Sequence, residues 1–154
     1  DVSAALGTRR DSLSNVSVTA SVADMRPVYG RARVLLAPSL WWESGARVMA
    51  EAALNGIPVI ATDHGGSSEM VGNGGYLLDL PDGFHDAPYT RLLPSDAVAQ
   101  VGGLVERLYD DEDVYRALAA RAAAHARAAH GIEESTERLC GALRPYLGAL
   151  PAPS

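Results

Sequence analysis

The stretch PSLWWESGARVMAEAALNGIPVIATDHGGSSE (residues 38–69) contains the helix, strand and turn signals that decide the fold. Its segment RVMAEAAL (47–54) has helical spacing, and Asn-Gly at 55–56 is typical of a left-handed helix stop. The segment IPVIAT (57–62) is a continuous apolar run, which indicates a strand buried on both faces. Short buried strands that alternate with helices predict a parallel sheet.

The alternation of strand and helix signals continues on both sides of this stretch. The sequence predicts further strands at 15–22, 33–39 and 75–80, a helix at 23–32 with Asp24 near its start and Pro27 in its first turn, a glycine turn with a short helix at 65–71, and a loop at 82–94. Three helices follow: 95–111 capped by Ser95 and Asp96, the Ala-rich 111–130 ended by Gly131, and 133–147.

We therefore predict an α/β fold with a Rossmann-like parallel sheet and flanking helices. The 154 residues are about right for one domain, with a sheet part at 1–94 and C-terminal helices at 95–154.

The composition excludes several classes of protein. The net charge is −6, every basic residue is Arg, and no basic run exists, so nucleic-acid binding has no support. The single Cys140 excludes an internal disulfide. The sequence has no apolar run of about eighteen residues and no signal-peptide pattern at 1–10, so we predict neither a membrane span nor a secretory signal.

A ligand site is expected where the predicted strands end. In an open parallel sheet, ligands bind in the crevice beyond the carboxyl ends of the strands. The segments 38–43 and 62–66 each follow such an end, so both are expected to face the same crevice. A helix that begins near Gly45 would present bare backbone amides there, which suit a phosphate or diphosphate.

Two carboxylates of this stretch are candidate ligands of sugar hydroxyls. Glu43 precedes the helix, and Glu51 follows eight residues later. The alternative is structural: Glu43 would then only interact with the helix dipole, and Glu51 would only pair with Arg47 four residues before it.

The aromatic and histidine residues carry weaker signals. Trp41 and Trp42 are adjacent, so one is expected to fill the core and the other to line the crevice. His64 could act as a base by its position, although a loop histidine that makes a local hydrogen bond is the more common case. The other histidines have no metal-ligand spacing with acids or with Cys140; they are His85, His125 and His130.

The combined pattern resembles the nucleotide-sugar-binding C-terminal domain of the retaining glycosyltransferases of family 4, also called group 1, which have the GT-B fold. The resemblance covers about residues 12 to 80. It rests on Pro38-Ser39, Trp42, Glu43, Glu51-Ala52, Gly56-Ile57-Pro58-Val59 and Gly65-Gly66-Ser67-Ser68-Glu69, in that order and spacing.

The resemblance implies a role for each matching residue. Glu43 would be the catalytic-site residue that bonds the donor sugar, and Glu51 would hold the ribose hydroxyls. The remaining donor-binding residues would be Gly45, Ala46 and Arg47 at the diphosphate through their amides, Ser21, Val22 and Asp24 at the base, and Gly65 and Gly66 near the sugar.

The resemblance also implies the reaction. A hexose would pass from a nucleoside diphosphate sugar to an acceptor glycan, lipid or small molecule, with no cofactor and no metal. The acceptor domain would precede this partial C-terminal domain, so the isolated chain would be inactive. The expected protein is bacterial and cytoplasmic, with peripheral attachment at the inner face of the membrane left open. Two alternatives remain: a nucleotide-sugar epimerase of the same fold, and a non-catalytic interaction module.

The last predicted helix is expected to lack a partner within the chain. In relatives, the chain end crosses to the N-terminal domain. The apolar residues of this segment are Ile132, Leu139, Leu143, Tyr146 and Leu147. We therefore expect either high mobility after about Gly131 or a dimer contact made by this helix.

Overall fold

The computed structural model describes residues 15–17 and 22–147, in two compact units at 1–30 and 31–154. The first unit contains helix α2 (Arg26–Tyr29), with Pro27 in its first turn as predicted. The predicted helix at 23–32 is too long, because a proline is tolerated only in the first turn of a helix. Half of the strand predicted at 15–22, residues 18–21, lies outside the described part of the chain, and the described residues 15–17 and 22 are not in a strand.

The second unit is built on a parallel sheet, which confirms the predicted α/β class. Its strands are β1 (Leu35–Ala37), β2 (Val59–Thr62) and β3 (Gly75–Leu78), hydrogen-bonded in the order β1-β2-β3. Leu36 pairs with Ile60, and Ile60 pairs with Tyr76. All four residues of β2 are buried, as its apolar sequence predicts for the central strand of the described sheet.

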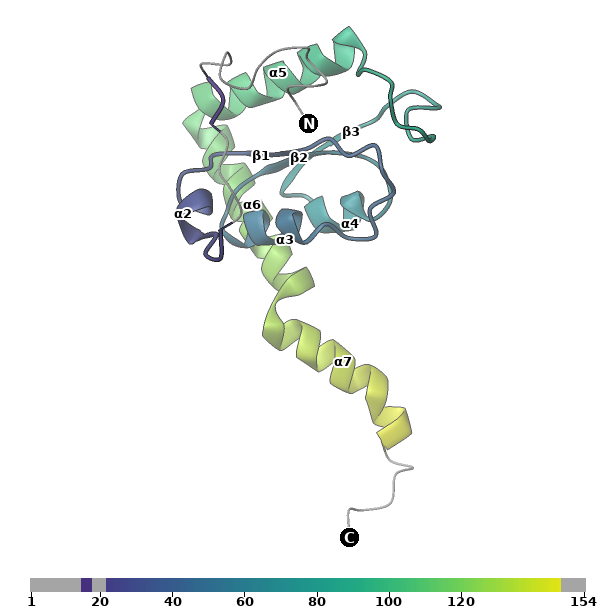
Figure 1. The fold of residues 1–154 in the computed structure, drawn as a ribbon. Coiled ribbons are helices and arrows are strands. Elements are labelled where there is room, and N and C mark those ends of the chain that lie inside the picture. Colours follow the sequence, from purple (N-terminus) through teal and green to yellow (C-terminus); the bar gives the residue numbers. More distant parts are fainter. Residues whose placement is uncertain (1–14, 18–21, 148–154) are drawn as a thin grey trace. The chain divides into compact units, whose positions relative to one another are not determined.

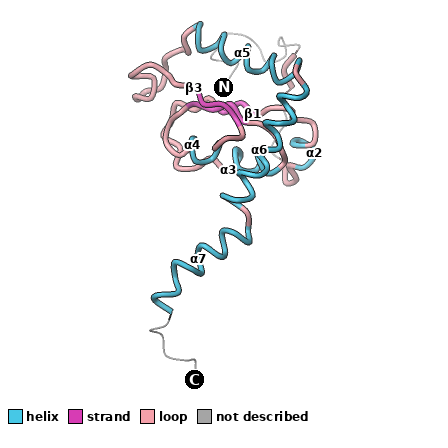
Figure 2. Tube along the Cα trace, turned by 180° about the vertical axis from the view of Figure 1, so that it is seen from behind, coloured by secondary structure: helices cyan, strands magenta, loops and turns pink. Residues whose placement is uncertain are grey.

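Helices cover both faces of this sheet (Figures 1 and 2). The connections α3 (Arg47–Leu54) and α4 (Ser67–Val71) lie on one face, and α5 (Ser95–Asp110) lies on the other. Helix α6 (Glu112–His130) packs against α3, α4 and α5, and it is followed by α7 (Ile132–Leu147), which contacts α6. No helix of the described residues is both long enough and apolar enough to cross a membrane.

Two buried clusters hold the second unit together. Ile60 and Leu78 from the sheet meet Leu108 and Leu118 from the helices, and each of the four is almost fully buried. Burial of such a side chain contributes about 1.5–3 kcal/mol. In the second cluster, the alanines of α6 pack against α3; its members are Ala53, Ala122 and Ala126. The Ala-rich segment is therefore a helix with a small-residue packing face.

The end of α3 follows the sequence prediction closely. Gly56 has a φ of 70°, and its amide donates to the carbonyl of Ala53 at 2.9 Å. The amide of Ile57 donates to the carbonyl of Ala52 at 3.0 Å. These two bonds are the Schellman pattern, in which glycine adopts the left-handed conformation without a Cβ penalty.

Three details of the predicted elements are wrong. The strand expected at 33–39 ends before Pro38, which has no amide for the ladder, and Leu36 is exposed instead of buried. The exposed side of Leu36 faces an apolar cavity of about 140 Å³ between the sheet and α5. At the start of α5, Pro94 is the N-cap residue and no side chain caps the helix, so Ser95 and Asp96 do not form the expected cap.

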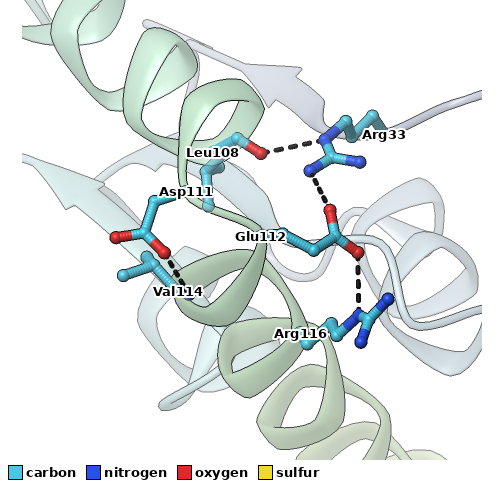
Figure 3. A network of polar contacts seen from close by, with 6 residues as sticks. All are labelled: Arg33, Leu108, Asp111, Glu112, Val114 and Arg116. Carbon is cyan, nitrogen blue, oxygen red and sulfur yellow. Dashed lines mark hydrogen bonds and ion pairs between the residues drawn. The ribbon is translucent and has the colours of Figure 1, made fainter.

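A polar network fixes the start of β1 to the junction of α5 and α6 (Figure 3). Arg33 donates from Nε to the carbonyl of Leu108 and from Nη2 to Glu112, both at 2.8 Å. Its guanidinium carbon lies 3.9 Å from the ring centroid of Tyr115. Arg33, followed by Arg116, lowers the pKa of the Glu112 carboxyl. Asp111 caps α6 by accepting the amide of Val114 at 2.9 Å.

Candidate functional site

The loop between β1 and α3 is attached to the end of β2. The Thr62 hydroxyl, which is fully buried, donates to the carbonyl of Ser39. His85 belongs to the loop after β3. Its ring nitrogen Nδ1 is 3.3 Å from the carbonyl oxygen of Leu40. Segments that follow all three strands therefore meet at the carboxyl edge of the sheet.

The loops after β1 and β2 touch through their backbones. The amide of Gly66 donates to the carbonyl of Glu43 at 2.6 Å. A Cβ at Gly65 would overlap the Glu43 carbonyl, and a Cβ at Gly66 would overlap the carbonyl of Ser44. Gly65 also has a φ of 61°, a conformation that glycine adopts without strain. This contact confirms that the two predicted loops share one edge, and it explains why both positions are glycine.

Helix α3 begins inside this contact region. Its first residue is Arg47, and Ala46 is the N-cap residue, so the helix starts two residues later than the predicted start near Gly45. No side chain caps the first turn. Gly45 packs against α4, since a Cβ there would lie 2.7 Å from Cε of Met70. Uncapped amides at a helix start attract anions, because their partial positive charges point out of the helix.

Glu51 and Arg47 form an ion pair on the surface of α3. Arg47 Nη2 lies 3.3 Å from Glu51 Oε1, and the two side chains are 90% and 38% exposed. Such a pair on a helix contributes about 0.2–0.5 kcal/mol. The structural alternative, in which Glu51 pairs with Arg47 on the helix surface, is therefore observed in the fold. Because the pair is weak, it leaves a role in ligand binding open.

Both tryptophans are exposed, so the expectation that one of them fills the core is wrong. The Trp41 ring lies 5.5 Å from the ring of Tyr89, and the Trp42 ring meets His64 edge-on at 4.9 Å. These partners come from the loops after β2 and β3. The aromatic rings therefore cover the loop surface beside Glu43 instead of the interior.

His64 and His85 form a stacked pair in the same region. Their ring centroids are 3.6 Å apart and the planes are 9° from parallel. The pKa of His64 is lowered, mainly by partial burial and further by the charge of His85. His85 has no metal-ligand spacing in the sequence, so the sequence pattern did not predict it as a site residue. The strand-end rule would have found it, since the loop 82–94 follows the carboxyl end of β3.

The residues expected at the nucleotide base lie in the first unit. Asp24 accepts hydrogen bonds from Nε of Arg26 at 2.9 Å and from its backbone amide at 3.0 Å. These bonds hold the pKa of the Asp24 carboxyl below its usual value. Val22 is exposed, and Ser21 lies outside the described residues. Within residues 15–17 and 22–147, no group of three or more His, Cys, Asp or Glu side chains is arranged to hold a metal ion.

Comparison with models of known protein families identifies the family of this chain. The family model described as glycosyl transferases group 1 matches residues 3–92, more than half of the 154-residue chain. No curated protein matches the chain. The matched residues include the three parallel strands, both loops at their carboxyl ends and the start of α3. The chain therefore belongs to the group 1 glycosyl transferases.

Proposed function

We propose that the edge formed by the loops after β1 and β2 binds a nucleoside diphosphate sugar, whose hexose the intact enzyme transfers to an acceptor with retention of the anomeric configuration. One observation supports this most strongly. The Gly66 amide bonds the Glu43 carbonyl, so a carboxylate, a glycine turn and the region of a helix start share one edge of the sheet. Ligands of open parallel sheets bind at such edges.

In this proposal the diphosphate lies at the start of α3. The amides of Gly45, Ala46 and Arg47 are the proposed donors, and the absence of a side-chain cap leaves the first turn open to an anion. As the bond to the sugar breaks, negative charge grows on the diphosphate. Amides held in place by the fold stabilise that charge without reorganisation, so the main contribution of the protein is electrostatic and positional.

The two carboxylates have different proposed tasks. Glu43, which is half-buried and adjacent to the glycine turn, accepts hydrogen bonds from the sugar hydroxyls. Glu51 accepts hydrogen bonds from the ribose hydroxyls. Its exposed ion pair with Arg47 costs little to exchange for such a ligand, because surface pairs contribute only about 0–1 kcal/mol.

The remaining parts of the proposal follow from the resemblance. Ser21, Val22 and Asp24 contact the base, partly through the backbone. A preceding N-terminal domain binds the acceptor, so this chain alone binds the donor but does not turn it over. No metal is required, because the amides of α3 and arginine side chains stabilise the diphosphate.

Calorimetric titration of the 154-residue chain with a panel of nucleoside diphosphate sugars tests the proposal. We expect saturable binding of at least one donor, with the same dissociation constant in EDTA and in magnesium, and weaker binding of the matching nucleoside monophosphate. Absence of binding for every donor would contradict the proposal. Binding that disappears in EDTA would contradict only the metal-independent part.

A further inference from the structure

The segment 39–43, which leads from β1 to Glu43, is held by a partner at each of its residues. The partners lie in β2 or in the loops after β2 and β3, and they contact either a backbone carbonyl or an aromatic ring of the segment. The pairs are Ser39 with Thr62, Leu40 with His85, Trp41 with Tyr89, Trp42 with His64 and Glu43 with Gly66. The position of Glu43 therefore depends on how firmly these partners are themselves held.

The loop 82–94 supplies His85 and Tyr89, and its own side chains close it into a compact unit. The guanidinium carbon of Arg91 lies 5.8 Å from the ring centroid of Phe84, and its Nη1 donates to the carbonyl of Asp82 at 3.5 Å. A Cβ at Gly83 would overlap the same guanidinium. Long loops inside a compact domain are uncommon, and those packed by their own side chains are frequently functional.

Tyr89 lies in an unusual backbone conformation. Its φ is 59°, in the left-handed region that residues other than glycine rarely occupy. Such a conformation persists only where the surroundings hold it, and it occurs preferentially at functional sites. The ring of Tyr89 contacts the ring of Trp41 at 5.5 Å. The strained residue of this loop is therefore one of the two that contact the segment 39–43.

His85 connects the loop 82–94 to both neighbouring loops. Its Nδ1 lies 3.3 Å from the carbonyl oxygen of Leu40, which can only accept, so this nitrogen donates. Its ring also stacks on His64 at 3.6 Å, and His64 in turn meets the ring of Trp42. Loss of the His85 ring would therefore release two consecutive supports of the segment that ends at Glu43.

The stack requires that the two histidines are not both charged, because like charges this close repel. The titratable side chains on the segments around the two rings are Glu43, Asp63, Glu69, Asp82, Asp86 and Arg91. In the described part of the chain, none of them forms a hydrogen bond or ion pair with either ring. Burial, followed by the charge of His85, lowers the pKa of His64, so the stack is favoured at neutral pH.

We propose that the loop 82–94 clamps the segment 39–43 against the carboxyl edge of the sheet, and that His85 is the positioning residue through which this loop holds Glu43 in place. The consequence for donor binding rests on the proposed function. The clamp itself does not, since it consists of contacts within the chain.

Hydrogen exchange of the Gly66 amide measures the clamp without a donor, because this amide bonds the carbonyl of Glu43. In His85→Ala its exchange at neutral pH is expected to be about tenfold faster than in wild type. The amide of Asp63, which bonds the carbonyl of Leu78, is the internal reference and should keep its rate. Leu92→Ala, at an 84% exposed residue of the same loop, is the matched control and should leave both rates unchanged.

The pH dependence distinguishes positioning by the stack from a general effect of the loop on stability. In wild type, the NMR shifts of the Glu43 and Gly66 amides should move together, with a midpoint below the ordinary histidine pKa of about 6.5. In His85→Phe a flat, uncharged ring still faces His64, so this joint movement should disappear.

Three results would overturn the clamp. They are an unchanged Gly66 exchange rate in His85→Ala, an equal rise at Asp63, and a joint pH movement of the same size in His85→Phe. The donor titration separates the clamp from the proposed function. If wild type binds no nucleoside diphosphate sugar, the proposed function fails and the exchange rates still decide the clamp. If wild type binds one, His85→Ala should bind it more weakly than Leu92→Ala does, and equal affinities would contradict the positioning role.

Discussion

The backbone amide of Gly66 donates a 2.6 Å hydrogen bond to the carbonyl oxygen of Glu43. This single bond joins the loop after β2 to the loop after β1, and a side chain at either Gly65 or Gly66 would collide with the first loop. The position of Glu43 therefore depends on the glycine turn.

Replacement of this glycine tests that dependence. In Gly66→Ala the new Cβ overlaps the Ser44 carbonyl, so the loop must move and the hydrogen bond to Glu43 lengthens. We expect a loss of about 1–3 kcal/mol in unfolding free energy, measured by urea denaturation, together with loss of donor binding. The matched control is Gly102→Ala in α5, where a Cβ has no neighbour within 4 Å. That change should stabilise the chain by about 0.5–1 kcal/mol, and equal losses for the two variants would contradict the assignment.

Substitutions of Glu43 and Glu51 distinguish the proposed roles of the two carboxylates in donor binding and turnover. In the intact transferase, Glu51→Gln is expected to weaken donor binding about 10- to 100-fold, because charge-assisted hydrogen bonds to the ribose contribute about 1.5–3 kcal/mol. Glu43→Ala is expected mainly to lower turnover, since the sugar changes charge as its bond breaks.

Arg47→Ala is the control for the role of Glu51. It removes the ion pair of Glu51 but keeps the backbone amide at position 47. If Glu51 serves only the ion pair, Arg47→Ala and Glu51→Gln will have equal effects on stability, and neither will change donor affinity. Wild-type turnover in Glu43→Ala would contradict the role proposed for that residue.

How much of this site the sequence could predict depends on the range of the forces involved. Helix α3, its stop at Gly56 and the central strand β2 were predictable, because periodicity and glycine chemistry act within a few residues. The meeting of Glu43 with Gly66 was also predictable, since parallel strands direct their carboxyl ends to one edge.

Features set by distant partners were not predictable in the same way. Trp41 and Trp42 find their ring partners on other loops, at Tyr89 and His64. The loop that carries His85 has no periodic pattern to indicate where it returns. Leu36 is exposed because the cavity between its side of the sheet and α5 is not filled. The apolar run alone does not reveal this cavity.

The lowered pKa of His64 makes stability depend on pH. When the pKa is lower in the folded than in the unfolded chain, protonation favours the unfolded chain. The stability is full above the ordinary histidine pKa of about 6.5 and falls as pH drops through the folded value. Urea denaturation from pH 8 to pH 5 should show this fall, and His64→Gln should flatten part of it. The pKa of His130 is also lowered, so His130→Gln should remove a separate part of the fall in stability at low pH. An unchanged slope in both variants would be inconsistent with this account.

Arg33 tests whether the network in Figure 3 holds β1 to the helices. Arg33→Ala and Arg33→Lys are both expected to lower the melting temperature, because lysine has no planar fork to bond Leu108 and Glu112 together. Arg107→Ala, at an exposed arginine of α5, should change the melting temperature little.

The same ion pair should make stability depend on pH. The pKa of Glu112 is lower in the folded chain, so the stability contributed by the Arg33–Glu112 pair should be lost below about pH 4.3, as pH falls through the folded value. Full retention of stability in Arg33→Lys would contradict the proposed role.

The most direct measurement of the central claim is a ¹H–¹⁵N NMR titration of the chain with the nucleoside diphosphate sugar that binds best. The account predicts that the amides of Gly45, Ala46, Arg47, Gly65 and Gly66 shift together and saturate with one dissociation constant. The amides of α7 should not move. Shifts that are absent from the start of α3 and gather elsewhere on the chain would contradict the account.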